Sequence, residues 1–342
     1  MKAAVYYRND DVRIEDLPVP GIGSGELLVR VEASGICGSD VMEWYRVKKA
    51  PLVLGHEVAG TVVEAGDGVE RFKVGDRVTV AHHVPCNSCV YCLRGEHSVC
   101  DTLRTTNFDP GGFAEFIRVP EINVDRGTFL LPGGVSFEEA TFSEPLGCVV
   151  RNFRRAGFEP GRTVLVLGSG VSGILHMKLA RALGAGAIVA TDVNEFRLEA
   201  ARRAGADHVV RADRDVPAEV RRLLGRGADF VVLCAARESA VRQAVKSVDR
   251  AGTLMFFAPL APGATVALPM FELWRDNITV VHSYASPPYD TEVAIELLAS
   301  RRVEVSDMIT HRLPLDRAAE GFAVTASSGD SLKVVIEPHA GG

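Results

Sequence analysis

The sequence has no uninterrupted apolar run of the roughly 18 residues that a membrane-spanning helix requires. Its opening stretch, MKAAVYYRNDDVRIED, contains no apolar h-region, which argues against a secretory signal peptide. No block of like charges occurs, and the net charge of −6 disfavours a nucleic-acid-binding surface. These absences argue against a membrane partner and a nucleic-acid partner. With 47% hydrophobic residues to fill a core, the chain is expected to be a globular protein of the cytoplasm.

The length of 342 residues is typical of two domains, and the apolar pattern changes at two points. Residues 1–147 are strand-rich, because apolar and polar side chains alternate there with the period of a half-buried strand. Residues 148–284 alternate six short apolar strands with helices, beginning at 163–167, which is typical of a doubly wound parallel sheet. Residues 285–342 follow the completed sheet, so we expect them to return to the first domain.

Four of the seven cysteines are spaced C-x2-C-x2-C-x7-C, and they are Cys86, Cys89, Cys92 and Cys100. In a reducing compartment, four thiolates this close favour one tetrahedral zinc ion over disulfides. An iron–sulfur cluster is the competing interpretation, but ferredoxin runs have their fourth cysteine after three residues and follow it with proline. The spacing therefore predicts a structural zinc. Cys148 and Cys234 lie in apolar stretches and are assigned to the core.

The stretch GSGVSG at residues 168–173 matches the G-x-G-x-x-G motif and lies between a predicted strand and a predicted helix. This context predicts a dinucleotide site, with the pyrophosphate at the helix N-terminus and an acid on the adenosine ribose. Asp192, at the end of the next strand, is the expected ribose acid and favours NAD over NADP. Arg197 could bind a 2′-phosphate or stack on adenine. The predicted cofactor contacts are Gly168, Gly170, Val171, Ser172, Gly173, Asp192 and Arg197.

A second set of metal-ligating residue types consists of Cys37, His56, Glu57 and Glu144. One thiolate, one imidazole and a carboxylate are ligands that zinc accepts while one position stays open for substrate. Spacing alone does not establish the site, because a lone cysteine is usually a small buried hydrophobe. The remaining histidines have no comparable neighbours in the sequence and are assigned structural roles: His82, His83, His97, His176, His208, His282, His311 and His339.

Taken together, these stretches resemble the zinc-containing medium-chain alcohol dehydrogenases, most of all their sorbitol (polyol) and threonine dehydrogenase branch. The shared motifs, besides the four cysteines and the glycine-rich stretch, are GICGSD (35–40), LGHEVAGTV (54–62), KVGDRV (73–78), SEPLG (143–147), TDVNEFRL (191–198) and ITHRLPL (309–315). The resemblance covers nearly the whole chain. It implies a GroES-like catalytic domain made of 1–147 and 285–342, a Rossmann domain at 148–284, two zinc ions, and assembly as a homodimer or homotetramer.

The resemblance also implies roles for single residues. Cys37 and His56 would bind the catalytic zinc, with Glu57 or Glu144 completing its ligands. Glu144 stands where other members have a second cysteine, and its harder carboxylate suits oxygen-rich substrates. Ser39 would take the proton from the substrate oxygen. Met42 occupies a position where many relatives have a proton-transferring histidine, so we expect ribose and water, or another group such as Glu57, to complete the path.

The expected activity is therefore NAD-linked oxidation of a secondary alcohol, a polyol or sugar alcohol, to the ketone. The alternatives are an L-threonine 3-dehydrogenase, a cyclitol or amino-sugar dehydrogenase, and an NAD- and zinc-binding structural or regulatory protein without turnover. A nucleic-acid-binding zinc ribbon would need more basic residues around the cysteines than Arg94 and Arg104.

Two aromatic groups are candidates for the substrate pocket. Trp44 and Tyr45 follow the Cys37 loop, and packing is the favoured role for them. Tyr284, Ser286 and Tyr289 lie where the chain leaves the Rossmann domain and are candidate substrate contacts.

Overall fold

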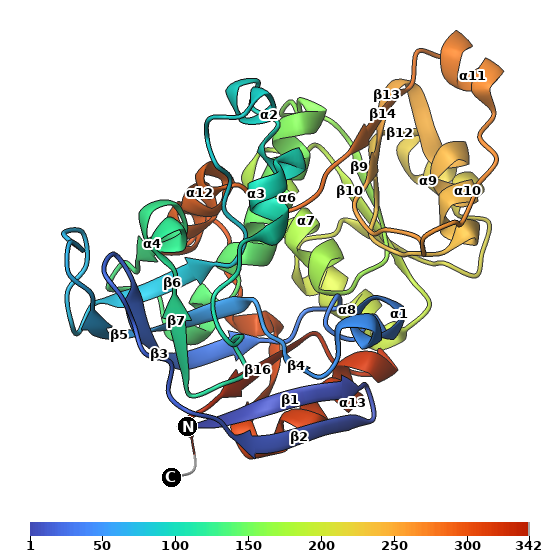
Figure 1. Cartoon of the computed structure of the whole chain (residues 1–342). Coiled ribbons are helices and arrows are strands. Elements are labelled where there is room, and N and C mark those ends of the chain that lie inside the picture. The colour runs from blue at the N-terminus through green and yellow to red at the C-terminus, as the bar shows by residue number, and fades with distance from the viewer. Residues whose placement is uncertain (341–342) are drawn as a thin grey trace. The chain divides into compact units, whose positions relative to one another are not determined.

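The computed structural model describes residues 1–340, which form two compact units (Figure 1). Unit 1 consists of Met1–Gly147 together with the segment that starts at Ala285, and unit 2 is Cys148–Tyr284. Among the described residues, no helix has both the length and the apolar character needed to cross a lipid bilayer.

Unit 2 is built on a six-stranded parallel sheet with the strand order β11-β10-β9-β12-β13-β14. The strands are β9 (Val164–Leu167), β10 (Ile188–Asp192), β11 (His208–Arg211), β12 (Ala228–Leu233), β13 (Val248–Phe256) and β14 (Thr279–His282). Every residue of β9, β10 and β12 is buried, as expected for central strands covered on both faces. The sequence prediction of a doubly wound α/β sheet is confirmed. Successive strands are added to one side of β9 as far as β11 and then, from β12 onward, to its other side.

The helices of unit 2 begin and end at recognisable residues. They are α7 (Val171–Ala182), α8 (Glu195–Arg203), α9 (Val216–Leu224), α10 (Glu238–Ser247) and α11 (Met270–Arg275). Asn194 caps α8 by accepting a hydrogen bond from the Phe196 amide, and Asp215 caps α9 in the same way. Helix α9 ends at Gly225, whose φ of 75° is the left-handed conformation that glycine adopts without strain. Right-handed crossovers place α7 and α8 on one face of the sheet and α9 and α10 on the other (Figure 1).

Unit 1 contains two mostly antiparallel sheets. A three-stranded sheet has the order β2-β1-β4, and a seven-stranded sheet has the order β15-β16-β3-β5-β6-β8, with β7 also paired to β3. The strands are β1 (Lys2–Arg8), β2 (Asp11–Asp16), β3 (Leu27–Gly35), β4 (Leu52–Val53), β5 (Glu57–Ala65), β6 (Arg77–Ala81), β7 (Phe116–Val119), β8 (Thr128–Leu130), β15 (Ile309–Pro314) and β16 (Lys333–Glu337). The C-terminal strand β16 pairs directly with β3, so the end of the chain completes the first sheet.

Short helices connect the strands of unit 1. They are α1 (Glu43–Arg46), η1 (Val47–Lys49), α2 (Val90–Leu93), η2 (His97–Val99), α3 (Asp101–Thr105), α4 (Glu121–Gly127), α5 (Phe137–Ala140), α12 (Pro288–Ala299), η3 (Ser306–Met308), η4 (Leu315–Arg317) and α13 (Ala318–Ser327). Helix α6 (Ser143–Ala156) contains the boundary between the units. Helix α13 packs on β16, and its Phe322 joins Tyr6 and Phe113 in one buried cluster.

Most strands that the apolar periodicity predicts lie within two residues of their observed bounds, but it did not indicate β1, β2, β4, β7, β8 or β15. The clearest difference is β13, which begins at Val248 where the sequence pattern predicts the end of a helix. A register shift between Ala228 and Phe230 lets this strand start early and pair irregularly with β12. Such a bulge changes the alternation of side chains, so the residue pattern does not indicate it.

Candidate functional site

Three of the predicted zinc ligands come together at one end of β5. Cys37 lies in the loop after β3, while His56 and Glu57 lie at the start of β5. One ligand atom from each of the three residues falls within 4.8 Å of the others. A soft thiolate beside an imidazole and a carboxylate is a donor set that suits zinc. The residues present therefore fit the metal that the sequence predicts.

Asp40 holds two of these residues in place, and the sequence analysis gave it no role. Its Oδ2 accepts a hydrogen bond from the Cys37 amide at 3.0 Å, and its Oδ1 lies 3.3 Å from His56 Nδ1. A carboxylate on the second nitrogen of a metal-binding histidine fixes the ring orientation and leaves Nε2 for the metal. The signal that could have found it is its place inside the GICGSD stretch.

The charges of this pair are coupled. Burial lowers the pKa of His56, but the Asp40 carboxylate outweighs burial and holds that pKa well above its ordinary value. Burial likewise raises the pKa of Asp40, and the His56 charge reverses the effect, so that pKa lies below its usual range. Because zinc binds neutral imidazole, protonation of His56 competes with metal binding at this site.

Glu57 forms a buried ion pair with Lys333, and both side chains are only 1% exposed. The pair spans three strands, because Gly35 of β3 lies opposite Glu57 of β5 on one side and Val335 of β16 on the other. A Cβ at Gly35 would overlap the Glu57 carboxylate, so the glycine leaves the space that the pair occupies. The Lys333 ammonium also lies 5.2 Å from the centre of the Phe142 ring.

Glu144 lies in the first turn of α6 and is partly buried. It is outside the group formed by Cys37, His56 and Glu57. Ser39 lies beside the group, with its amide 3.4 Å from Cys37 Sγ. Its hydroxyl accepts a hydrogen bond from Arg46, a residue to which the sequence analysis gave no role.

The purely structural role assigned to His82 needs correction. Its ring packs against His56 with 4.9 Å between ring centres, and the His83 ring lies tilted against it at 3.8 Å. Burial lowers the pKa of His82 well below its ordinary value and that of His83 to about 4. Among the described residues, His82 Nδ1 is buried and has no hydrogen-bond partner. The two imidazoles form one wall beside His56, and strand β6, which ends at Ala81, places them there.

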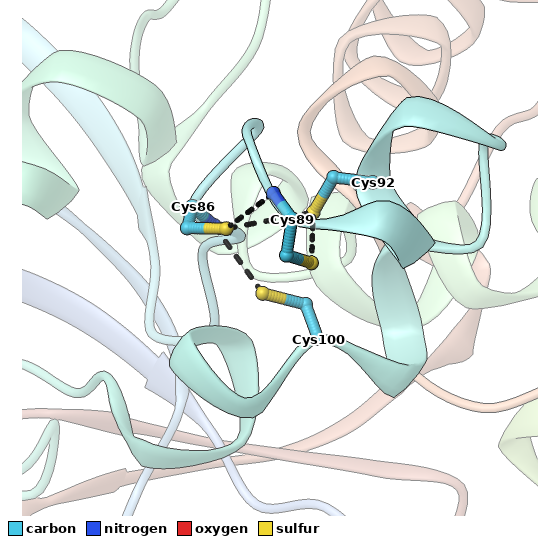
Figure 2. Close-up of side chains that lie close together, drawn as sticks. All are labelled: Cys86, Cys89, Cys92 and Cys100. Carbon is cyan, nitrogen blue, oxygen red and sulfur yellow. Dashed lines mark hydrogen bonds between the residues drawn. The ribbon is translucent and has the colours of Figure 1, made fainter.

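The four cysteines form a second metal-binding group (Figure 2). Cys89 Sγ and Cys92 Sγ are 3.6 Å apart, and Cys86 Sγ and Cys92 Sγ are 4.0 Å apart. A tetrahedral zinc with Zn–S bonds of about 2.3 Å separates its sulfurs by about 3.8 Å. The geometry therefore fits a closed zinc site that leaves no position for substrate.

Hydrogen bonding and burial act differently on these thiols. Hydrogen bonds from Ser88 lower the pKa of Cys86 to about 5, whereas burial raises the pKa of Cys92 to about 12. All seven cysteines of the chain are free thiols rather than disulfides. Because zinc binds thiolates, metal binding at this site must release protons from the buried members.

The glycine-rich stretch forms the turn from β9 into α7, as the sequence predicts. Gly168 has a φ of 97°, and a Cβ at Gly173 would overlap the Gly168 carbonyl oxygen. Gly170 caps α7, and Val171 and Ser172 form its first turn. The helix N-terminus is therefore open to an anion, which is what a dinucleotide pyrophosphate requires.

Asp192 does more than the sequence analysis assigned to it. Its Oδ2 accepts a hydrogen bond from the Ser169 amide at 2.8 Å, and its Oδ1 accepts one from the Asn194 amide at 3.0 Å. The carboxylate thus ties the glycine-rich turn to the end of β10 and keeps lone pairs for a ribose. Arg197 Nε is buried without a hydrogen-bond partner in the described chain, and Arg197 Nη1 would lie 3.9 Å from a Cβ at Gly170. A guanidinium beside this turn whose Nε has no hydrogen-bond partner fits a nucleotide.

The candidate substrate contacts differ in exposure. Trp44 and Tyr45 are 41% and 38% exposed, so the expectation that they are packed is only partly met. Tyr284 and Tyr289 are also exposed. Ser286 is buried and shares a hydrogen bond of 2.7 Å with Thr291, which stabilises the start of α12.

Comparisons with known proteins agree with this geometry. The family model described as "Alcohol dehydrogenase GroES-like domain" matches residues 23–126, and "Zinc-binding dehydrogenase" matches residues 172–300. The sorbitol dehydrogenases of Gallus gallus and Bacillus subtilis are each 33% identical; the first match covers 98% of this chain and 96% of the relative, and the second covers 99% and 98%. A structure titled as a zinc-binding dehydrogenase from Sinorhizobium meliloti, bound to NADP, superposes with a TM-score of 0.88 at 29% identity, covering 98% of this chain and 99% of that one.

Fold, site and comparisons together define an oxidoreductase that uses zinc and a nicotinamide cofactor. The chain belongs to the zinc-dependent medium-chain alcohol dehydrogenase family, near its sorbitol dehydrogenase branch. The predicted GroES-like and Rossmann folds are confirmed.

Proposed function

We propose that this protein oxidises a secondary alcohol, of the polyol or sugar-alcohol class, to the corresponding ketone with NAD. The observation that carries the proposal is the pairing of Cys37 with His56 in one group, with Asp40 bonded to both of them. When bound, zinc supplies Lewis acidity for the substrate oxygen and the nicotinamide accepts the hydride. An open donor set serves that chemistry, whereas a protein without turnover has no use for it.

We propose Cys37, His56 and Glu144 as the three protein ligands of the catalytic zinc. Glu57 is close enough to be a ligand, but Lys333 binds one of its carboxylate oxygens. Glu57 is then a buried carboxylate next to the metal site. Because it is already paired with Lys333, it is less available to bind the metal. A carboxylate as third ligand donates less charge than a second thiolate, which favours oxygen-rich substrates.

The Ser39 hydroxyl accepts the proton that leaves the substrate oxygen. The position of Ser39 next to the donor group, with its amide 3.4 Å from Cys37 Sγ, supports this role. Met42 offers a thioether, which cannot carry the proton onward.

The polyol class is supported by the carboxylate-bearing donor set and by the sorbitol dehydrogenases among the relatives. NAD is supported by Asp192, because a carboxylate at the end of β10 binds ribose hydroxyls and repels a 2′-phosphate. The reduced thiols of the four-cysteine group support a cytoplasmic location.

Assembly as a symmetric homodimer or homotetramer is supported by the surface of unit 2. Strand β14 is at the edge of the six-stranded sheet, so one row of its backbone groups can pair with another strand. On the preceding helix α11, Met270, Phe271 and Trp274 are 67%, 62% and 75% exposed. An exposed apolar group and an edge strand without a partner are each typical of an interface between copies.

The proposal is tested by following NADH or NADPH absorbance with the zinc-loaded protein. Sorbitol, xylitol, inositol, 2,3-butanediol, L-threonine and primary alcohols are offered in parallel, each with NAD and with NADP. We expect turnover confined to vicinal diols and polyols, with NAD preferred. Turnover of L-threonine alone would replace the polyol class, and a preference for NADP would assign Arg197 to the 2′-phosphate.

A further inference from the structure

Arg46 is bound to Ser39 through two separate atoms. It is the last residue of α1, and its side chain reaches back along the chain so that Nε donates to the Ser39 carbonyl oxygen at 2.9 Å and Nη2 donates to Ser39 Oγ at 3.1 Å. The guanidinium lies over the Tyr45 ring, 4.8 Å from its centre, and the side chain is only 15% exposed. These contacts fix the guanidinium rather than leaving it as a mobile surface charge.

The same guanidinium also binds the carboxylate that orients the metal site. Arg46 Nη2 lies 3.2 Å from Asp40 Oδ1, and that oxygen lies 3.3 Å from His56 Nδ1. Asp40 is completely buried, so its charge needs cationic and hydrogen-bonded partners. Arg46 is therefore connected through one carboxylate to His56 and, through one hydroxyl, to the residue proposed to accept the proton.

The contact also determines what the Ser39 hydroxyl can do. A hydroxyl has one proton to donate and two lone pairs to accept hydrogen bonds, whereas a guanidinium only donates. Arg46 therefore takes one lone pair of Ser39 Oγ and leaves the other lone pair and the proton for the reaction. Because neither Arg46 nor Met42 can accept a proton, Ser39 must pass its proton to the cofactor ribose or to water.

We propose that Arg46 is a positioning residue that fixes the Ser39 hydroxyl and, through Asp40, the His56 imidazole in one arrangement. With zinc and the nicotinamide cofactor bound, the substrate hydroxyl would give its proton to Ser39 Oγ while Ser39 would give its own proton to the ribose or to water. The cofactor would supply the acceptor for the hydride that leaves the carbon with two electrons. The Ser39 half of this inference rests on the proposed function. The His56 half rests only on the metal site.

The first test is a double-mutant cycle with the alcohol that the wild type oxidises best. We expect Arg46→Met to lower kcat about 10- to 100-fold, to change the KM of the alcohol less than about twofold, and to increase the solvent isotope effect on kcat, because proton transfer is then limiting. Arg46→Lys should recover part of the loss. In a Ser39→Ala background, Arg46→Met should lower kcat by a much smaller factor than it does in the wild type. If the two substitutions lower kcat by independent factors that multiply, or if the solvent isotope effect is unchanged, Arg46 does not position the Ser39 hydroxyl.

The second test measures the metal rather than the activity. Zinc-loaded protein is mixed with a chromogenic chelator, and the release of the first zinc per chain is timed. Arg46→Met should release it at least about fivefold faster than the wild type, Arg46→Lys should be intermediate, and Ser39→Ala should match the wild type. The control is Lys48→Met, which removes an exposed cation from the adjacent η1 and should change neither readout. Release at the wild-type rate from Arg46→Met would overturn the His56 half, even if no offered alcohol is oxidised and the proposed function fails.

Discussion

Glu57 and Lys333 are 276 residues apart in sequence and form a fully buried ion pair beside the predicted catalytic metal site. The strand that carries Lys333, β16, is the last strand of the chain, and its pairing with β3 places the ammonium next to Glu57. The end of the chain therefore completes the electrostatic environment of a site whose metal-binding residues lie near its beginning.

The first prediction concerns removal of one partner from this pair. Lys333→Met should lower the free energy of unfolding by about 3–5 kcal/mol, because it leaves the Glu57 charge buried and unpaired. The double variant Glu57→Gln with Lys333→Met should recover most of that loss and keep two zinc ions per chain, since Glu144 is the proposed ligand. Urea unfolding and zinc analysis measure both effects.

Its control is an exposed ion pair. Arg317 and Glu320 pair at 2.7 Å on the surface, with side chains 55% and 46% exposed. Glu320→Gln should change stability by less than about 1 kcal/mol. If Lys333→Met costs no more than this control, the Glu57–Lys333 pair does not have the structural role assigned to it.

The second prediction concerns the four-cysteine group. Cys100→Ser should reduce the zinc content from two ions to one per chain and lower the thermal midpoint, because metal binding and folding of this lobe are coupled. The zinc that remains should be the catalytic one, so that the folded fraction keeps alcohol oxidation. Loss of both zinc ions, or loss of activity without loss of fold, would show that the two sites are not separate.

The third prediction follows from His176, which is buried in unit 2 with Nδ1 2.7 Å from the Ser172 carbonyl oxygen and Nε2 2.9 Å from Asn152 Nδ2. Burial lowers its pKa to about 4. The unfolded chain therefore binds a proton at this side chain below about pH 6.5, before the folded chain does. The resulting stability is present above pH 6.5 and is lost as the pH falls toward 4, about 2 kcal/mol of it between pH 7 and 5.

Urea unfolding at pH 7 and pH 5 checks this sign. His176→Gln should show a smaller decrease in stability between the two pH values than the wild type, whatever its stability at pH 7. His208→Gln, at an exposed position of β11, is the matched control and should keep the wild-type pH dependence. A His176 variant that loses as much stability on acidification as the wild type would refute the assignment.

The fourth prediction concerns assembly. Trp274→Asp places a charge in the exposed apolar group of α11 and should halve the mass measured by light scattering. Val74→Asp is the control, since Val74 is 64% exposed in unit 1. A wild-type monomer, or a dimer that tolerates Trp274→Asp, would exclude this surface as the interface.

Local sequence patterns predicted the parts of the fold and site that depend on neighbouring residues. The central strands β9, β10 and β12 of unit 2 were predictable because buried parallel strands are short continuous apolar runs. The turn at Gly168 and Gly173 was predictable because only glycine permits its backbone conformation and close approach. The four-cysteine metal site was predictable because its ligands are close together in the sequence, between Cys86 and Cys100.

The contacts that hold the catalytic residues were not predictable in this way. Lys333 reaches Glu57 only because β16 returns to β3, and no local pattern records that pairing. Arg46 and His82 belong to no recognisable sequence motif. They reach the site only because α1 ends at Arg46 and β6 ends just before His82. Burial and charge partners of single side chains depend on the tertiary fold, which periodicity does not specify.

The most direct test of the central claim is zinc content measured together with alcohol-dependent NADH formation for the wild type and Cys37→Ser. We expect two zinc ions per chain in the wild type and one in the variant, with the four-cysteine group still filled. The thermal midpoint should be nearly unchanged, while alcohol oxidation should fall by about a thousandfold or more, since the metal contributes several kcal/mol to the reaction. A variant that keeps both zinc ions, or that oxidises the alcohol at the wild-type rate with one, would contradict the assignment of a catalytic zinc to Cys37 and His56.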